Sequence, residues 1–335
     1  MRFITQVMNE LKVVSRAFVL YQGTGAFSFL FEFDCRFIGI TAVFLEVLIM
    51  RKKKRRNIII AVVAVVIIAV IAFFSFGKKN NQQSAKTVTV TVGTVGATKA
   101  ERAIWKSVAD TAKKKYGIIV KTKNFSDYNQ PNSALKSGDL DLNAFQHYNF
   151  LNNWNKANKS NLVAIGKTYI APIRLYSLKY KSLKSLPKGA TIAIPNDATN
   201  EARALLVLKN AGLITLKGTS ATKIYSVADI KSNPKNFKIK EVATEQAARV
   251  LKSVDAAVVN NDYANPAGLG DKQTIYVEPI NKDSYQWINI IVARKKDKNK
   301  KAYKEVVKAY QTEKTKQLYK KYYGSKQVAA WDAKF

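Results

Sequence analysis

The sequence predicts an α/β protein with two lobes joined by a hinge of two crossover strands, preceded by one N-terminal transmembrane helix. Three observations lead to this prediction. Short apolar strands alternate with amphipathic helices through most of the chain, a pattern typical of α/β layers with mainly parallel sheets. The alternating region, residues 87–335, is long enough for two lobes of ordinary size. Ahead of it lies an uncharged apolar run, Ile58–Phe76.

The apolar run near the N-terminus predicts a membrane anchor. At 1.5 Å per residue, Ile58–Phe76 can cross the roughly 30 Å hydrocarbon core of a bilayer. Six consecutive basic residues, Arg51–Arg56, precede it and favour the cytoplasmic side, so the rest of the chain is expected outside. Ser75 and Gly77 have the spacing of a signal-peptide cleavage site, so cleavage after Gly77 is the alternative. We expect an uncleaved anchor, because the run exceeds the usual length of a signal peptide's apolar region.

The segment before the basic run has neither helical nor strand periodicity. Met50 begins a basic and then apolar sequence, which is the order found in an export signal. We therefore interpret residues 1–49 as a non-native leader or upstream extension and 50–77 as the basic region and membrane segment. The alternative is that the first segment forms a hydrophobic hairpin or a second membrane segment. The polar stretch 78–86 is expected to be a flexible linker.

The first lobe is expected to begin with a strand, a helix and a second strand. Thr and Val alternate over Thr87–Val92 and then meet Gly93, as in a strand that ends at a turn. Gly117 ends the helix before the apolar run Ile118–Val120. The apolar residues that share one face of this helix are Ala103, Ile104, Val108 and Ala112.

The same order of elements recurs toward the C-terminus. Ala190–Ile194 predicts a strand, and a helix should follow it and end near Gly212. Asp255–Val259 and Asn289–Ala293 predict two more buried strands. Apolar spacing indicates two C-terminal helices, the first through Tyr303, Val306, Val307 and Tyr310 and the second through Leu318, Tyr319 and Tyr322.

Two extended apolar segments are candidates for the crossovers. They are Ile170–Leu178 and Trp287–Ala293. Placing the crossovers there assigns residues 87–175 plus 291–335 to lobe 1 and residues 176–290 to lobe 2. Two lobes joined by two strands can open and close as a hinge.

The chain is strongly basic, with a net charge of +33 from 56 Lys and Arg against 23 Asp and Glu. Residues 1–50 are neutral, and Arg51–Arg56 with Lys78 and Lys79 contribute eight positive charges, so +25 remains on residues 80–335. Such a charge is common in nucleic-acid-binding proteins. An external location argues against nucleic acid and favours anionic wall polymers or lipid head groups. A basic surface adhesin that binds anionic cell-wall polymers is therefore the alternative function.

Several kinds of chemistry lack the residues that they need. Cys35 is the single cysteine and His147 the single histidine, so a disulfide framework or a cysteine-rich zinc site is excluded from the exported region. That region has no G-x-G-x-x-G, no P-loop and no G-x-S-x-G motif. We expect no metal, no cofactor and no catalytic residues.

Seven segments carry a more specific signal. They are F-S-D-Y-N-Q-P-N-S-A-L (125–135), D-L-N-A-F-Q-H (141–147), I-A-P-I-R-L-Y-S (170–177), S-L-P-K-G-A-T-I-A-I-P-N-D-A-T-N-E-A-R-A-L (185–205), A-G-L-I (211–214), D-A-A-V-V-N (255–260) and I-N-I-I-V-A-R (288–294). Together they resemble the methionine-binding lipoproteins of ABC importers, the NlpA-type substrate-binding family. The resemblance implies a periplasmic-binding-protein-like type II fold. It also implies a non-catalytic receptor that passes methionine to an ABC permease and its ATPase subunit.

The resemblance also implies a ligand site. Arg203 would hold the ligand's carboxylate, because its planar guanidinium matches a carboxylate in a bidentate pair. Without ligand, this arginine is expected to be solvated in the open cleft. Asn260 and Asn289 would offer carbonyl oxygens to the ammonium group. Aromatic side chains would pack against the thioether, and these are Tyr128, Phe145 and His147.

Two departures from the family pattern affect anchoring and specificity. The family carries a lipid-modified cysteine after its export signal, whereas Lys78 follows Gly77 here, so the helix itself would anchor the protein to the cell membrane. Phe150 stands where the family usually has tyrosine, and Asn149 where it has proline. A polar ligand contact would be lost or supplied by Tyr148. The ligand could therefore be L-methionine, D-methionine, methionine sulfoxide or a methionine-containing dipeptide.

Overall fold

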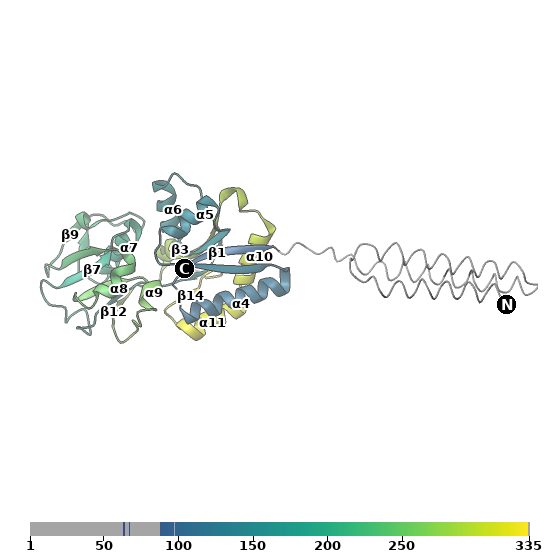
Figure 1. Ribbon diagram of the computed structural model, residues 1–335. Coiled ribbons are helices and arrows are strands. Elements are labelled where there is room, and N and C mark those ends of the chain that lie inside the picture. Colours follow the sequence, from purple (N-terminus) through teal and green to yellow (C-terminus); the bar gives the residue numbers. More distant parts are fainter. Residues whose placement is uncertain (1–62, 64–66, 68–87, 97, 334–335) are drawn as a thin grey trace, which may run out of the picture. The chain divides into compact units, whose positions relative to one another are not determined.

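The computed structural model describes residues 63, 67, 88–96 and 98–333 (Figure 1). By its internal contacts the chain divides into two units, Met1–Ala85 and Lys86–Phe335. The predicted leader and basic run lie outside the described residues, as do the linker 78–86 and all but two residues of the predicted membrane helix. Within the described part of the chain, the structure contains no helix that is both long enough and apolar enough to span a bilayer.

The second unit contains a first five-stranded sheet in the order β2-β1-β3-β13-β4. Its strands are β1 (Thr89–Val95), β2 (Ile119–Phe125), β3 (Leu142–His147), β4 (Val163–Lys167) and β13 (Asn289–Ala293). Side chains alternate between its two faces, as the pleat of a strand requires. Val90 and Val92 of β1 pack on one face, whereas Val95 packs on the other. The sheet is therefore buried on both sides.

Helices cover the two faces of this first sheet. One face is covered by α4 (Lys99–Tyr116), α10 (Lys301–Tyr310) and α11 (Glu313–Tyr323), and the other by α5 (Gln130–Ser137) and α6 (Tyr148–Ala157). The predicted helix before Gly117 is confirmed as α4. It begins where Thr98 Oγ1 accepts a hydrogen bond of 3.0 Å from the Glu101 N–H, and it ends at Gly117 with φ of 68°.

A second five-stranded sheet has the order β10-β7-β11-β6-β12. Its strands are β6 (Arg174–Tyr176), β7 (Thr191–Pro195), β10 (Lys238–Val242), β11 (Ala256–Val259) and β12 (Thr274–Val277). The helix after β7, α7 (Ala198–Asn210), packs on one face, and α8 (Ala247–Val250) packs on the other. Figure 1 shows these elements in green, beside the first sheet.

Short elements complete the described part of the unit. They are α9 (Asn261–Ala264), the strand pairs β5 (Tyr169–Ile170) with β14 (Val328–Ala329) and β8 (Thr215–Leu216) with β9 (Ile230–Ser232), and the 3-10 turns η1 (Val227–Asp229), η2 (Thr244–Gln246), η3 (Lys282–Trp287) and η4 (Lys295–Asp297).

The two five-stranded sheets are mainly parallel, as expected, but each also contains one strand that runs against the other four. β13 runs antiparallel to both β3 and β4, and β6 runs antiparallel to both β11 and β12. Each of these two strands is the one that the chain adds directly after it passes from one sheet to the other. The passages are residues 171–173, between β5 and β6, and residues 278–288, between β12 and β13.

The first strand also differs from its prediction, because it continues through Gly93 to Val95. A Cβ at position 93 would lie 2.5 Å from Leu140 Cδ1 and 3.2 Å from Phe125 Cε2. This glycine therefore allows a close approach of neighbouring side chains inside the sheet and does not mark a turn.

Candidate ligand-binding site

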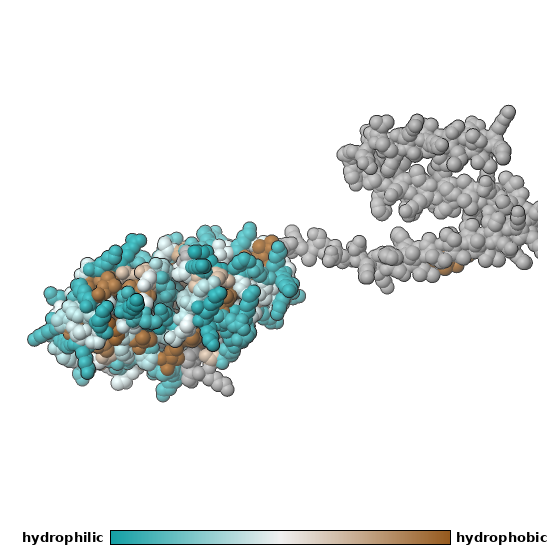
Figure 2. Space-filling view, turned by 90° about the horizontal axis from the view of Figure 1, so that it is seen from below, coloured by the Kyte–Doolittle hydropathy of each residue, from teal (hydrophilic) through white to brown (hydrophobic). Residues whose placement is uncertain are grey.

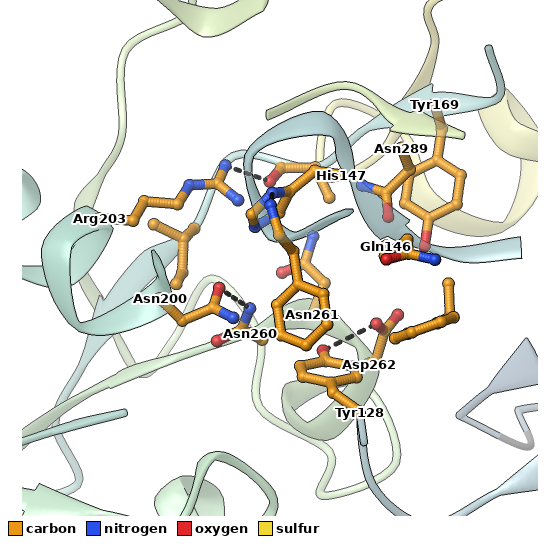
Figure 3. A pocket seen from close by; sticks show the side chains of 14 residues that line it. Tyr128, Gln146, His147, Tyr169, Asn200, Arg203, Asn260, Asn261, Asp262 and Asn289 are labelled. Atoms are coloured by element: carbon orange, nitrogen blue, oxygen red, sulfur yellow. Dashed lines mark hydrogen bonds between the residues drawn. The ribbon is translucent and has the colours of Figure 1, made fainter. Parts of the chain in front are cut away.

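A cavity lies between elements of the two sheets, and the space that it encloses, including the part open to solvent, is about 420 Å³. All seven residues of the predicted site line it, from both sheets: Tyr128, Phe145, His147, Phe150, Arg203, Asn260 and Asn289. Seven further residues that the sequence analysis did not single out complete the lining: Gln146, Tyr169, Ala171, Ile173, Asn200, Asn261 and Asp262 (Figure 3).

Aromatic rings form one wall of the cavity. The rings of Tyr128 and Phe145 are stacked with their centroids 5.7 Å apart, and the centroid of Phe150 lies 5.9 Å from each of them in a T-shaped arrangement. Such offset and edge-to-face arrangements are the preferred geometries of aromatic pairs. Tyr148 is absent from the cavity lining, because its ring stacks on Tyr285 at 5.3 Å. It therefore does not replace the hydroxyl that Phe150 lacks.

His147 presents a polar atom to the cavity rather than an apolar face alone. It precedes α6, where its Nδ1 accepts a hydrogen bond of 3.0 Å from the Phe150 N–H. Burial, together with the nearby charge of Arg203, lowers the pKa of His147 to about 3, so the ring is neutral at physiological pH. With Nδ1 as acceptor, the proton is on Nε2. That Nε2–H is buried without a hydrogen-bond partner.

Asn260 presents an unpartnered acceptor. Asp197 caps α7 and accepts hydrogen bonds from both the backbone N–H and the Nδ2 of Asn200. This fixes the amide of Asn200, so its Oδ1 accepts a bond of 2.7 Å from Asn260 Nδ2 (Figure 3). The other end of that amide, Asn260 Oδ1, is buried without a partner. A ligand that donates a hydrogen bond there would satisfy it.

Arg203 is buried and ion-paired, so the expectation of a solvated arginine is wrong. It is 3% exposed. Its Nε donates to Glu278 Oε1 at 2.9 Å and its Nη2 to Glu278 Oε2, while Nη2 also donates to the carbonyl of Ala171 at 3.0 Å. Its guanidinium lies 4.8 Å from the ring centroid of Trp287. A guanidinium removed from water needs such an anion, and these contacts leave Nη1 for a ligand.

Glu278 was not among the residues selected from the sequence, and no motif around it marks it as a site residue. It lies in the second passage between the sheets, where its Oε2 also accepts the N–H of Ile173 from the first passage at 3.1 Å. Arg203 therefore contacts both passages, through Glu278 and through Ala171.

Asp262 was also missed, although a signal for it exists. It lies two residues after Asn260, in the first turn of α9 directly after β11. Strand ends of α/β sheets commonly carry ligand-binding side chains, so an acidic residue directly after a buried strand is a candidate site residue. Its Oδ2 accepts a hydrogen bond of 2.8 Å from the Tyr128 hydroxyl, which belongs to the first-sheet side of the cavity (Figure 3).

A ring of amides supports the floor of the cavity. Asn132 Nδ2 donates to Gln146 Oε1 at 2.8 Å, Gln146 Nε2 donates to Asn143 Oδ1 at 2.9 Å, and Asn143 Nδ2 donates to Asn132 Oδ1 at 2.8 Å. All three side chains are buried. Because each amide is satisfied by its neighbours, Gln146 is held in place beside His147. Across the described residues, the acidic, histidine and cysteine side chains form no group of three that could hold a metal ion.

A family model described as NlpA lipoprotein matches residues 90–331. The "Probable D-methionine-binding lipoprotein MetQ" of Haemophilus influenzae is 43% identical over 233 residues, which are 69% of this chain and 84% of that protein. "Outer membrane lipoprotein 1" of Mannheimia haemolytica is 44% identical over 234 residues, covering 69% of this chain and 83% of that one.

Two solved structures have the same fold. The substrate binding protein of a methionine transporter from Streptococcus pneumoniae is 45% identical, with a TM-score of 0.69 over 72% of this chain and 96% of that chain. A nutrient binding protein from Burkholderia cenocepacia, bound to methionine, is 44% identical, with a TM-score of 0.68 over 72% of this chain and 99% of that chain. The mixed α/β architecture is therefore that of substrate-binding proteins.

Proposed function

Because the chain belongs to the NlpA lipoprotein family, we propose that it is an extracytoplasmic substrate-binding protein that delivers methionine, or a close derivative, to an ABC importer. The similar structures from Streptococcus pneumoniae and Burkholderia cenocepacia support this function. The observation that carries it is the cavity, which places an unpartnered donor and an unpartnered acceptor beside Arg203. An α-amino acid offers a partner to each of these groups.

The ligand's carboxylate is assigned to Arg203 and His147. Glu278 already uses Nε and Nη2 of the guanidinium, so the carboxylate approaches Nη1. The Nε2–H of His147 then donates to the same carboxylate group. The carboxylate is thus bound by one charged donor, Arg203, and one neutral donor, His147. The sequence had led us to expect a bidentate pair with Arg203 alone.

The remaining groups of the ligand are assigned to the rest of the lining. Asn260 Oδ1 and the side chain of Asn289 accept from the α-ammonium group. The rings of Tyr128, Phe145 and Phe150 surround the thioether, which packs well at aromatic edges. No bond of the ligand is broken in this scheme, so the protein acts as a receptor and not as an enzyme.

The two sheets with their helices form the two lobes of a type II binding protein. Residues 171–173 and 278–288 serve as the hinge, because the chain passes between the sheets there. Ligand binding between the lobes favours the closed form. The permease and its ATPase subunit then receive the ligand from the closed protein.

The N-terminal helix is proposed as the membrane anchor of this receptor. Ile58–Phe76 would take the place of the lipid that other family members carry, with the binding domain on the extracytoplasmic side of the cell membrane.

The surface is largely hydrophilic on the face that Figure 2 shows, in keeping with the basic composition. Net charge is the sole support for the wall-polymer adhesin, so the receptor is favoured.

Isothermal titration of the full chain tests the proposed function. L-methionine, D-methionine, methionine sulfoxide and glycyl-methionine are titrated in turn, and ligand released by denaturing the purified protein is identified by mass spectrometry. We expect one-to-one binding of at least one of these ligands and weaker binding of leucine. If all four produce no heat and no shift in melting temperature, the proposal is wrong.

A further inference from the structure

We propose that Asp262 is the counter-ion of the ligand's α-ammonium group and makes that group a requirement for tight binding. This inference rests on the proposed function and assigns a specificity residue within that site. Its starting point is the charge of the cavity. Of the fourteen lining residues, all within the described chain, Arg203 and Asp262 carry charge, and Arg203 is already neutralised by Glu278.

Asp262 has no cation of its own among the described residues. It forms no ion pair with them, and its hydrogen-bond partner at 2.8 Å is the hydroxyl of Tyr128. A carboxylate removed from water without a cation is costly. Burial raises the pKa of Asp262 to about 6, although the hydroxyls of Tyr128 and Tyr169 lower it.

The groups around Asp262 on other elements add no positive charge. From α4, Glu101 faces it across a neighbouring cavity that both residues line together with Tyr169 and Tyr323. Burial, and next the charge of Asp262, raises the pKa of Glu101 to about 8. The next residue of α9, Tyr263, is neutral, because burial and then the charge of Asp262 raise the pKa of its hydroxyl. The groups that face Asp262 are therefore acidic or neutral, and a bound cation would be stabilised there.

The position of Asp262 matches the expected position of the ammonium group. Arg203 and Asn200 lie three residues apart on α7, so they are neighbours on one helical face. Asn200 holds Asn260, whose buried Oδ1 lacks a donor, and Asp262 follows two residues later. A carboxylate bound at Arg203 thus places its α-ammonium toward Asn260 and Asp262. Asn260 Oδ1, which lacks a donor, and the Asp262 carboxylate, which lacks a cation, therefore belong to the same turn.

A ligand without an amino group provides the decisive comparison. The full-length protein and its Asp262→Asn variant are titrated with L-methionine and with 4-(methylthio)butanoate, which has the same carboxylate and thioether. We expect the wild type to prefer methionine by roughly tenfold or more, since a lost charge pair at a buried site has large effects. Asp262→Asn should reduce that preference to within about threefold by weakening methionine binding alone. The matched control is Asp271→Asn, whose side chain is 82% exposed and which should keep the preference.

Proton release gives a second readout that does not require a variant. An ammonium beside Asp262 favours the ionised carboxylate, so methionine binding near pH 6 should release part of a proton, and affinity should fall as pH drops below 6. Titration in buffers with different ionisation enthalpies measures this. Release should be absent with 4-(methylthio)butanoate and in Asp262→Asn, but should persist in Glu101→Gln, which separates the two carboxyls.

The outcomes separate this inference from the proposed function. If the wild type binds methionine but binds 4-(methylthio)butanoate equally well, or releases no proton at pH 6, the assignment of Asp262 is wrong and the receptor function stands. If Asp262→Asn fails to fold, proton release by the wild type at pH 6, present with methionine and absent with 4-(methylthio)butanoate, decides. If the wild type binds neither ligand, the assignment of Asp262 is wrong, and the receptor function is also wrong if D-methionine, methionine sulfoxide and glycyl-methionine show no binding.

Discussion

At the scale of single residues, Arg203 has a structural partner as well as a ligand to bind. Its guanidinium is held by Glu278 and by the carbonyl of Ala171 before any ligand arrives. The two passages between the sheets are thereby tied to the helix that carries the arginine. A change at Arg203 should therefore affect the stability of the free protein as well as its affinity.

We expect Arg203→Ala to lower both the stability of the free protein and its affinity for methionine. Leaving the nearly buried carboxylate of Glu278 without its partner should cost roughly 3–5 kcal/mol of unfolding free energy. For a unit of this size, each kcal/mol lowers the melting temperature by about 2–4 °C. Methionine affinity should also fall by at least about tenfold. Differential scanning calorimetry without ligand and titration calorimetry measure the two effects.

The double variant Arg203→Met, Glu278→Leu is the control for that prediction. Replacing both partners by apolar residues removes the unpaired charge, so most of the stability should return. Binding should stay weak, because Nη1 is still missing. Full affinity in the double variant would show that Arg203 does not contact the ligand.

Much of the candidate site could be predicted from sequence, and the misses have physical causes. All seven residues selected from the family resemblance line the cavity. Glu278 could not be found, because its importance depends on a contact with a helix 75 residues away in the chain. The polar role of His147 also needed the structure, since its tautomer follows from the Phe150 N–H bond.

At the scale of elements, apolar periodicity located the strands but not their directions. Asn289–Ala293 forms β13 with the predicted bounds, yet it runs antiparallel to its neighbours. A strand buried on both faces has the same pattern in either direction, so the mixed sheets could not be read from sequence. The extension of β1 through Gly93 was missed for a related reason, because the contacts of Leu140 and Phe125 with that glycine are tertiary.

Gly166 is the element-scale position at which we expect a small change to be costly. It lies in β4 against α10, and a Cβ there would be 2.6 Å from Val307 Cγ1 and 3.0 Å from Val307 Cγ2. Overpacking of this kind costs about 1–3 kcal/mol, so Gly166→Ala should lower the urea midpoint.

The comparison for Gly166→Ala is Gly270→Ala. At position 270 an added Cβ would meet nothing closer than the flexible end of Lys326 at 3.5 Å, and φ is not positive. That variant should unfold at or above the wild-type midpoint. Equal midpoints for the two variants would contradict the proposed packing of β4 on α10.

At the scale of the whole molecule, the strands of one sheet come from a continuous stretch of the chain, whereas the strands of the other come from two separate parts of it. The second sheet takes all its strands from the continuous stretch between Arg174 and Val277. Its two core clusters lie within residues 173–276. The first sheet combines strands before residue 168 with β13, and its core needs α10 and α11.

This difference predicts that the half with the second sheet can fold alone, whereas the first half of the chain's first sheet cannot. A fragment of residues 171–279 should fold alone and give a cooperative thermal transition by far-UV circular dichroism, since it keeps its core and the Arg203–Glu278 pair. A fragment of residues 88–170 should remain unfolded, because it lacks β13 and two covering helices. A cooperative transition in the second fragment, or none in the first, would contradict this prediction.

The place of β13 in the first sheet also sets an order of events during synthesis. β13 lies between β3 and β4, so until it is made β3 has an open edge and β4 has no partner within that sheet. About 120 residues separate the end of β4 from the start of β13, which at 5–20 residues per second corresponds to roughly 6–24 s. Open strand edges pair readily with other chains. The half of the domain that is translated first is thus completed last, and for those seconds the nascent chain depends on whatever shields the open edge of β3 and the unpaired β4.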